Sequence, residues 1–179
     1  MIYSKKLFGL KMTNTIPPEY EKLLQIARGN RKENNAFFQK LKKLRPKDLD
    51  IVTNSYHEKA FQNIDCLKCA NCCATTGPLL KNRDVMILSG EFNMRPSEFT
   101  EHYLKTDEDG DLVFKNLPCP FLGKDKYCSV YSSRPTACRD YPHTQQRNII
   151  EKIPVTFLNT TICPAVAVVV ENLKKHYLK

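Results

Sequence analysis

Eight cysteines are the residues of this 179-residue chain whose type and spacing point to chemistry. Four of them stand in one short run, Cys66-Leu-Lys-Cys69-Ala-Asn-Cys72-Cys73. Cysteines that are adjacent or two residues apart rarely meet the geometry of a disulfide bond. The same spacing lets a tight loop bring three thiolates to one soft metal centre. We therefore interpret the run as metal-ligating, and thiolates select zinc, copper(I) or iron–sulfur clusters over calcium and magnesium.

The other four cysteines lie in short polar or proline-containing segments, as metal ligands commonly do. They are Cys119, Cys128, Cys138 and Cys163. Eight thiolates can form two four-cysteine sites. One would join Cys66, Cys69 and Cys72 to Cys163, which precedes Pro164 in an arrangement similar to that of ferredoxin clusters. The second would use the remaining four cysteines. Cys119 could replace Cys163 in this scheme, and one [4Fe–4S] cluster with four cysteines left over stays open.

Residues close to Cys138 are candidates to support the metal. They are Arg134, Arg139, Tyr141 and His143. A guanidinium here could hydrogen-bond a thiolate or sulfide and offset the negative charge of a four-thiolate site. Arg134 could equally stack on Tyr131 or pair with Asp140. His143 is a candidate ligand or proton donor, although a single histidine near a metal loop more often supports the ligands than binds the metal.

Five blocks of the chain resemble, in order, the CxxCxxCC cysteine-cluster family. They are Cys66-x2-Cys69-x2-Cys72-Cys73, Cys119-Pro-Phe-Leu122, Cys128-Ser-Val-Tyr131, Arg134-Pro-x2-Cys138-Arg139-x-Tyr141-Pro142 and Cys163-Pro. Its members are described as zinc- or iron-chelating proteins, so the resemblance implies metal binding over about residues 62 to 178. One branch, the flagellin lysine N-methylases, implies an iron–sulfur cluster and methyl transfer from S-adenosylmethionine. Those proteins are longer, and this chain lacks room for their additional parts.

Positive charge is concentrated in a segment without cysteines. Residues 1–61 hold 13 lysines and arginines against 6 acidic residues, whereas residues 62–143 hold 10 against 11. The net charge of +9 therefore marks one arm of the chain, for which an acidic protein is the expected partner. Few aromatic residues accompany the basic ones, and the zinc-finger spacing of cysteine and histidine is missing, which argues against nucleic acid.

The elements that position the cysteines are predicted to be mainly helical. Amphipathic helices are expected over 18–29, 32–44 and 47–61 in the basic arm. In the cysteine-bearing body we expect a loop over 66–76, helices over 81–89 and from Pro96, a short helix over 134–141 and a C-terminal helix over 163–177. The Asp-Gly pair at 109–110 predicts a β-hairpin.

These observations give one set of predictions. The fold class is mainly α with a small β-hairpin: an irregular cysteine-rich metal-binding body preceded by short basic helices. The domains are a disordered leader at 1–15, with Met1 or Met12 as the natural start, a basic helical arm at 16–61 and a cysteine-cluster domain at 62–179. No apolar run has the length of a signal peptide or a membrane span, so we expect reduced thiols, the cytoplasm and no membrane partner.

The predicted function is that of a cytoplasmic metalloprotein that binds an iron–sulfur cluster (4Fe–4S), zinc or both, with a redox or metal-handling role. The alternatives are a cluster-dependent protein-modifying enzyme, such as a lysine N-methylase, and a zinc-stabilised nucleic-acid-binding module. Phosphate-binding glycine loops, a nucleophile elbow and zinc-protease motifs are missing from the sequence. Whether the protein is an enzyme is left undecided.

Overall fold

The computed structural model describes residues 16–178, which form two compact units. Unit 1 comprises Ala70–Tyr141, and unit 2 joins Ile16–Cys69 to residues 142–178. The leader predicted at 1–15 lies outside the described residues. The proposed boundary between a basic arm at 16–61 and a body at 62–179 stays a prediction. In the part of the chain that the structure describes, no helix is both long enough and apolar enough to cross a bilayer.

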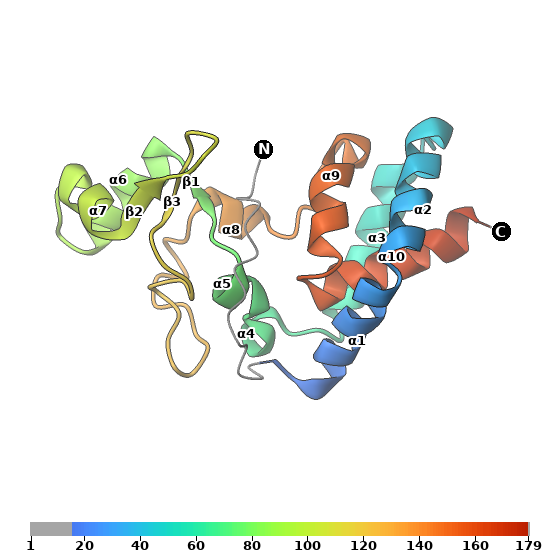
Figure 1. Cartoon of the computed structure of the whole chain (residues 1–179), viewed down its shortest axis with the longest axis horizontal. Helices are drawn as coiled ribbons and strands as arrows, with labels where there is room; N and C mark the ends of the chain where they lie inside the picture. Colours follow the sequence, from blue (N-terminus) through green and yellow to red (C-terminus); the bar gives the residue numbers. More distant parts are fainter. Residues whose placement is uncertain (1–15, 179) are drawn as a thin grey trace. The chain divides into compact units, whose positions relative to one another are not determined.

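Unit 2 is a bundle of helices taken from both ends of the described chain (Figure 1). Its helices are α1 (Pro18–Gly29), α2 (Arg31–Leu44), α3 (Leu49–Phe61), α4 (Cys66–Cys69), α9 (Ile149–Asn159) and α10 (Pro164–Tyr177). Helix α10 packs against α3 and α1, and α2 packs against α9. The core is aliphatic and fully buried, and includes Leu24, Leu41, Val166, Val169 and Leu173. Burial of these side chains is the main force that holds the bundle together.

The predicted helices of unit 2 are confirmed within about two residues, because each carries its own local signals. A proline occupies the first turn of α1 and of α10, where a missing N–H costs no hydrogen bond. Helix α9 was not predicted, since Pro154 stands inside it and a proline normally ends a helix. Burial of Ile149, Ile153 and Val155 outweighs that penalty here.

Unit 1 is built from shorter elements around a small sheet. They are α5 (Asn71–Thr75), β1 (Leu79–Leu80), α6 (Asn82–Glu91), α7 (Pro96–Tyr103), β2 (Leu104–Thr106), β3 (Leu112–Phe114) and α8 (Thr136–Asp140). The sheet is antiparallel in the order β1-β3-β2, with Lys105 opposite Val113 and Leu79 opposite that same Val113. The predicted hairpin is confirmed as β2–β3, and β1 extends it to three strands. The mainly helical fold class is confirmed as well.

Aromatic side chains fill the core of unit 1. Phe121 lies among Phe92, Phe99, Tyr103 and Phe114, with ring centroids 5.1 to 6.3 Å apart. Phe99 is completely buried. Because Phe121 belongs to the Cys-Pro-Phe-Leu block, the core anchors one of the cysteine-bearing loops.

The segment 66–76 is not the loop that was predicted. It forms two single-turn helices, α4 and α5, separated by Ala70 in a left-handed conformation with φ of 47°. A Cys-x-x-Cys spacing matches one helical turn, so residues i and i+3 share a face. The spacing predicts a metal loop, but it is equally compatible with a short helix.

Candidate metal centre

The cysteines are divided between the two units. Unit 1 contains Cys72, Cys73, Cys119, Cys128 and Cys138, and unit 2 contains Cys66, Cys69 and Cys163. The division falls inside the cysteine run, since α4 belongs to unit 2 and α5 to unit 1. Within the described residues, none of the eight cysteines forms a disulfide bond.

Backbone hydrogen bonds bring three cysteines of unit 1 together. The N–H of Cys119 donates to the carbonyl oxygen of Cys73 at 2.8 Å. Leu122 and Cys128 form an antiparallel bridge, and the N–H of Ser129 donates to the carbonyl oxygen of Phe121 at 2.9 Å. These contacts fix Cys119 between Cys73 and Cys128, although the three residues are far apart in sequence.

Cys138 is positioned by a buried carboxylate that the sequence reasoning missed. Asp84 accepts hydrogen bonds from the Lys81 N–H and from both the N–H and the hydroxyl of Thr136, each at 2.9 Å. Thr136 begins α8, the helix that carries Cys138. Burial raises the pKa of Asp84, but these hydrogen bonds outweigh it and the net pKa is lowered. The only sequence signal is an acid at the fourth residue of the predicted helix over 81–89.

The four cysteines Cys73, Cys119, Cys128 and Cys138 act on one another electrostatically. Burial raises the pKa of the Cys119 thiol to about 12, with further contributions from the charges of Cys73 and Cys128. Burial also raises the pKa of Cys138, which responds to the charges of the other three. Charges shift a pKa this way only at short range. The four thiols therefore lie within electrostatic range of one another in unit 1, and each is partly exposed.

Several thiols of both units are approached by backbone N–H groups. The N–H groups of Phe121 and Leu122 act on Cys119, and those of Ala165 and Val166 act on Cys163. Each cysteine is followed by a proline, which has no N–H, so the donors belong to the second and third residues after the cysteine. N–H donors favour the charged form of a thiol, which is the form that binds metal.

Cys73 differs from the other thiols of unit 1. Its sulfur lies 4.0 Å from the sulfur of Cys72, and this hydrogen bond lowers the pKa of Cys73 to about 7. Cys73 is therefore more readily converted to the thiolate that a metal requires than Cys119, Cys128 or Cys138.

Unit 2 brings its three cysteines into a second group. Cys69 and Cys163 are buried and Cys66 is exposed. Cys163 lies directly before α10, and its N–H donates to the carbonyl oxygen of Asn159 at 2.8 Å. Burial raises the pKa of Cys163 to about 12, and the charges of Cys69 and Cys66 add to the increase.

The predicted supporting residues have different surroundings. Arg134 stacks on the Tyr131 ring at 4.0 Å and donates to the Tyr131 carbonyl oxygen at 2.7 Å. Burial raises the pKa of Cys128 and Cys138, and the charge of Arg134 offsets part of that rise. Arg139 donates to the Arg134 carbonyl oxygen and to the Thr136 hydroxyl. Tyr141 ends unit 1, and His143 is buried in unit 2.

The donor set fits a soft metal, but the side chains are not arranged as a closed site. Among residues 16–178, no three side chains of metal-binding type lie close enough to hold one ion in this structure. Unit 1 nevertheless supplies four neighbouring sulfur donors, which is the number that a structural zinc site or a four-cysteine cluster takes.

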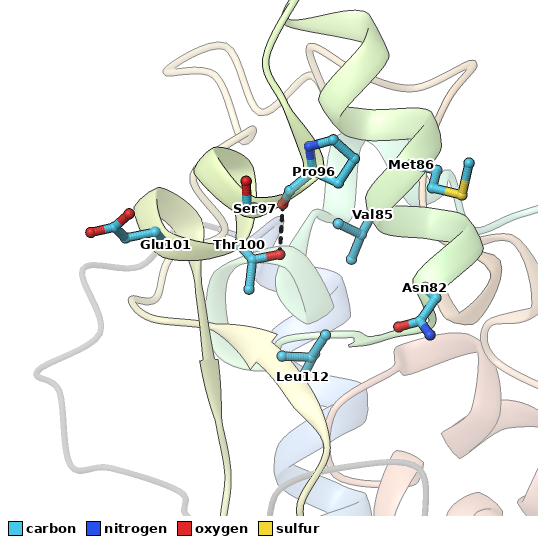
Figure 2. Close-up of a pocket in the computed structure, with 8 residues that line it drawn as sticks. All are labelled: Asn82, Val85, Met86, Pro96, Ser97, Thr100, Glu101 and Leu112. Atoms are coloured by element: carbon cyan, nitrogen blue, oxygen red, sulfur yellow. Dashed lines mark hydrogen bonds between the residues drawn. The ribbon is translucent and has the colours of Figure 1, made fainter.

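Unit 1 also has a pocket of about 480 Å³ between α6 and α7 (Figure 2). Met86 and Thr100 are among its lining residues, and no cysteine lines it.

The comparison with known families agrees with this donor set. A family model described as "CxxCxxCC: Putative zinc- or iron-chelating domain" matches residues 65–158, more than half of the chain. The chain belongs to this family, and membership supports a metal-binding protein. Cys163 lies beyond the matched residues. No curated protein and no solved structure matches the chain.

Proposed function

We propose that this protein binds a soft metal through four thiolates of unit 1, those of Cys73, Cys119, Cys128 and Cys138. The observation that carries the proposal is the backbone pairing of Cys73 with Cys119 and of Leu122 with Cys128. The mutual influence of the thiols on their pKa values supports it. To bind, the thiols lose their protons and turn toward a common centre, and the metal replaces the protons.

The metal is zinc or the iron of an iron–sulfur cluster, since four thiolates select these over hard cations. When bound, it supplies folding free energy to unit 1 and, in a cluster, electron transfer. Other residues of unit 1 position the ligands and offset their charge. Phe121 anchors one ligand loop in the core, Asp84 holds the helix of Cys138, and the charge of Arg134 offsets that of the thiolates.

We also propose Cys66, Cys69 and Cys163 as ligands held by unit 2. The burial of Cys69 and Cys163 and the backbone N–H groups aimed at Cys163 support this assignment. Cys72 is a further proposed ligand because its sulfur lies beside that of Cys73. Arg139, Tyr141 and His143 remain proposed supporting residues. Eight thiols are compatible with a reducing compartment, and we propose the cytoplasm.

Metal content tests the proposal directly. We expect protein purified without oxygen to contain zinc, or iron with acid-labile sulfide, measured by elemental analysis and a sulfide assay. Visible absorption distinguishes the two, because an iron–sulfur cluster is coloured and a zinc site is not. Metal below one equivalent for every two chains would contradict the proposal.

Single replacements then locate the ligands. Cys119→Ser and Cys138→Ser should each remove the metal of unit 1. Ser132→Ala is the matched control, since Ser132 is exposed in the same segment and should leave metal content unchanged. Cys163→Ser should leave the metal of unit 1 in place, so the two groups of cysteines can be tested separately. Retention of all metal in both Cys119→Ser and Cys138→Ser would rule out the proposed centre.

A further inference from the structure

The corner between α2 and α3 carries an unusual density of positive charge. We define the basic corner as residues 40–51, which include the end of α2, the connection and the start of α3. Its cations are all exposed, and they are Lys40, Lys42, Lys43, Arg45 and Lys47. Cations at a helix C-terminus stabilise the helix dipole. Arg45 and Lys47 lie beyond the last helical residue of α2, so this role does not account for the whole set.

These cations are not neutralised within the described residues. Across residues 16–178, none of the five takes part in an ion pair. The two acids of the corner have other roles. Asp48 accepts a hydrogen bond from the Tyr177 hydroxyl at 3.0 Å, and Asp50 accepts the N–H groups of Asn148 and Ile149. The corner therefore presents net positive charge to solvent.

Exposed aliphatic side chains accompany the charge. Leu44 is 55% exposed and Ile51 is 75% exposed. Leu178, 42% exposed, follows Tyr177, which contacts Asp48 in the corner. A surface that combines aliphatic side chains with a polar, charged rim is typical of a protein interface.

We propose that the basic corner binds an acidic, amphipathic segment of a partner protein. Acidic side chains would face the five cations, and apolar side chains would cover Leu44 and Ile51. Nucleic acid fits less well, because a phosphate backbone offers nothing apolar to these residues and the corner lacks an exposed aromatic ring for base stacking. A membrane surface also fits less well, because Phe37, Phe38 and Leu41 on the apolar face of α2 are buried in the core of unit 2.

The test uses the full chain and a fluorescent helical peptide made of glutamate and leucine. A leucine-to-serine version of the peptide, a DNA duplex and phosphatidylserine vesicles serve as competing probes. We expect the glutamate–leucine peptide to bind more tightly than each of these by fluorescence anisotropy. Equal binding of the leucine-free peptide would overturn the proposal, and so would tighter binding of DNA or vesicles.

Variants locate the interaction on the molecule. Lys42→Glu with Lys43→Glu should weaken peptide binding about tenfold or more, because two attractive charges become repulsive. Leu44→Ser should weaken it about threefold to tenfold through lost apolar contact. The control is Lys22→Glu with Lys32→Glu, which makes the same charge change at two other exposed lysines of unit 2. An equal loss in the control would show attraction by overall charge and would overturn the proposal. Metal content, measured in parallel, should be unchanged in every variant.

Discussion

Unit 2 and unit 1 are stabilised in different ways. Apart from the four-residue α4, unit 2 packs helices of 11 to 14 residues around aliphatic side chains that are almost fully buried. Unit 1 has strands of two or three residues, helices of five to ten residues and a smaller core, but five of the eight cysteines. We therefore expect apolar burial to be sufficient for the stability of unit 2, and we expect unit 1 to depend on the proposed metal ligation for comparable stability.

Metal removal should produce the largest difference between the units. Chelation should unfold unit 1 and leave the helices of unit 2 in place, because structural zinc in small domains supplies on the order of 10 kcal/mol of apparent free energy. Hydrogen exchange measured by mass spectrometry would show lost protection in residues 70–141 alone. Equal loss of protection in α3 and α10 would contradict the contrast between the units.

Core replacements sharpen the contrast. Phe99→Ala in unit 1 and Leu24→Ala in unit 2 should each lower the free energy of unfolding by about 3–5 kcal/mol, since both side chains are completely buried. Only Phe99→Ala should also let a chelator remove the metal of unit 1 at lower concentration. Denaturant unfolding and chelator titration measure the two effects. A similar loss of metal in Leu24→Ala would show that the units are not independent.

The buried carboxylate of unit 1 gives a pH-dependent effect. Asp84→Asn should lower the free energy of unfolding by about 1.5–3 kcal/mol, because three hydrogen bonds to a charged acceptor are lost or weakened. The pKa of Asp84 is lowered in the folded protein, so its stabilisation is present above the ordinary aspartate value and is lost as the pH falls through the folded value.

Urea unfolding of wild type and Asp84→Asn, between neutral pH and about pH 3, measures this contribution. The gap between the two proteins should shrink at the acid end. Asp125→Asn is a control, since Asp125 is exposed and caps only the nearby Tyr127 N–H. A gap that stays constant with pH would contradict the role assigned to the Asp84 charge.

The buried lysine of unit 2 should have a smaller effect. Lys174 is 4% exposed, and its ammonium lies 2.7 Å from both Glu33 and Glu171. Lys174→Met should lower the free energy of unfolding by about 1–2 kcal/mol. The loss is limited because the carboxylates of Glu33 and Glu171 are partly exposed, so water still solvates their charges when the ammonium is removed. Lys175→Met, at the exposed neighbour, should cost nothing measurable in thermal unfolding. An unchanged melting temperature in Lys174→Met would remove the ion group as a stabilising element.

Arg134→Lys should show the smallest effect. Lysine keeps the charge but loses the stacking on Tyr131, which is worth about 0.5–1 kcal/mol at an exposed site. Metal release to a chelator should be a few times faster, while Arg83→Lys, at an exposed arginine of α6, should match wild type. Identical release rates in all three proteins would exclude a supporting role for Arg134.

What could be predicted from the sequence depended on local signals. Helices α1 and α10 each have a proline in the first turn, and α2 and α3 have apolar residues at helical spacing, so the predicted bounds of all four lie close to the observed ones. Strand β1 has two residues and depends on pairing with β3, which no local pattern reveals. Helix α9 was not predicted because Pro154 is a local signal against a helix. The burial of the apolar face of α9 outweighs that signal, and it depends on contacts with residues far away in the sequence.

The candidate site follows the same division. The type and spacing of the cysteines identify all eight thiols as candidate metal ligands. They do not show which of the thiols lie near one another in the fold. The backbone hydrogen bond from Cys119 to Cys73 joins residues that are 46 positions apart in the sequence. The hydrogen bond from the Thr136 N–H to Asp84 joins residues that are 52 positions apart. Such contacts exist only after the chain has folded. An isolated aspartate on a helix therefore gave no sign of its role beside Cys138.

The two-segment origin of unit 2 has a consequence for synthesis on the ribosome. Helix α3 emerges early, but its packing partner α10 begins only at Pro164. Every cysteine of unit 1 has been translated before α10 starts, so unit 1 can fold and take up metal while α1, α2 and α3 still lack a complete core. During that interval the exposed apolar faces of the first three helices are the part of the nascent chain that a chaperone would recognise.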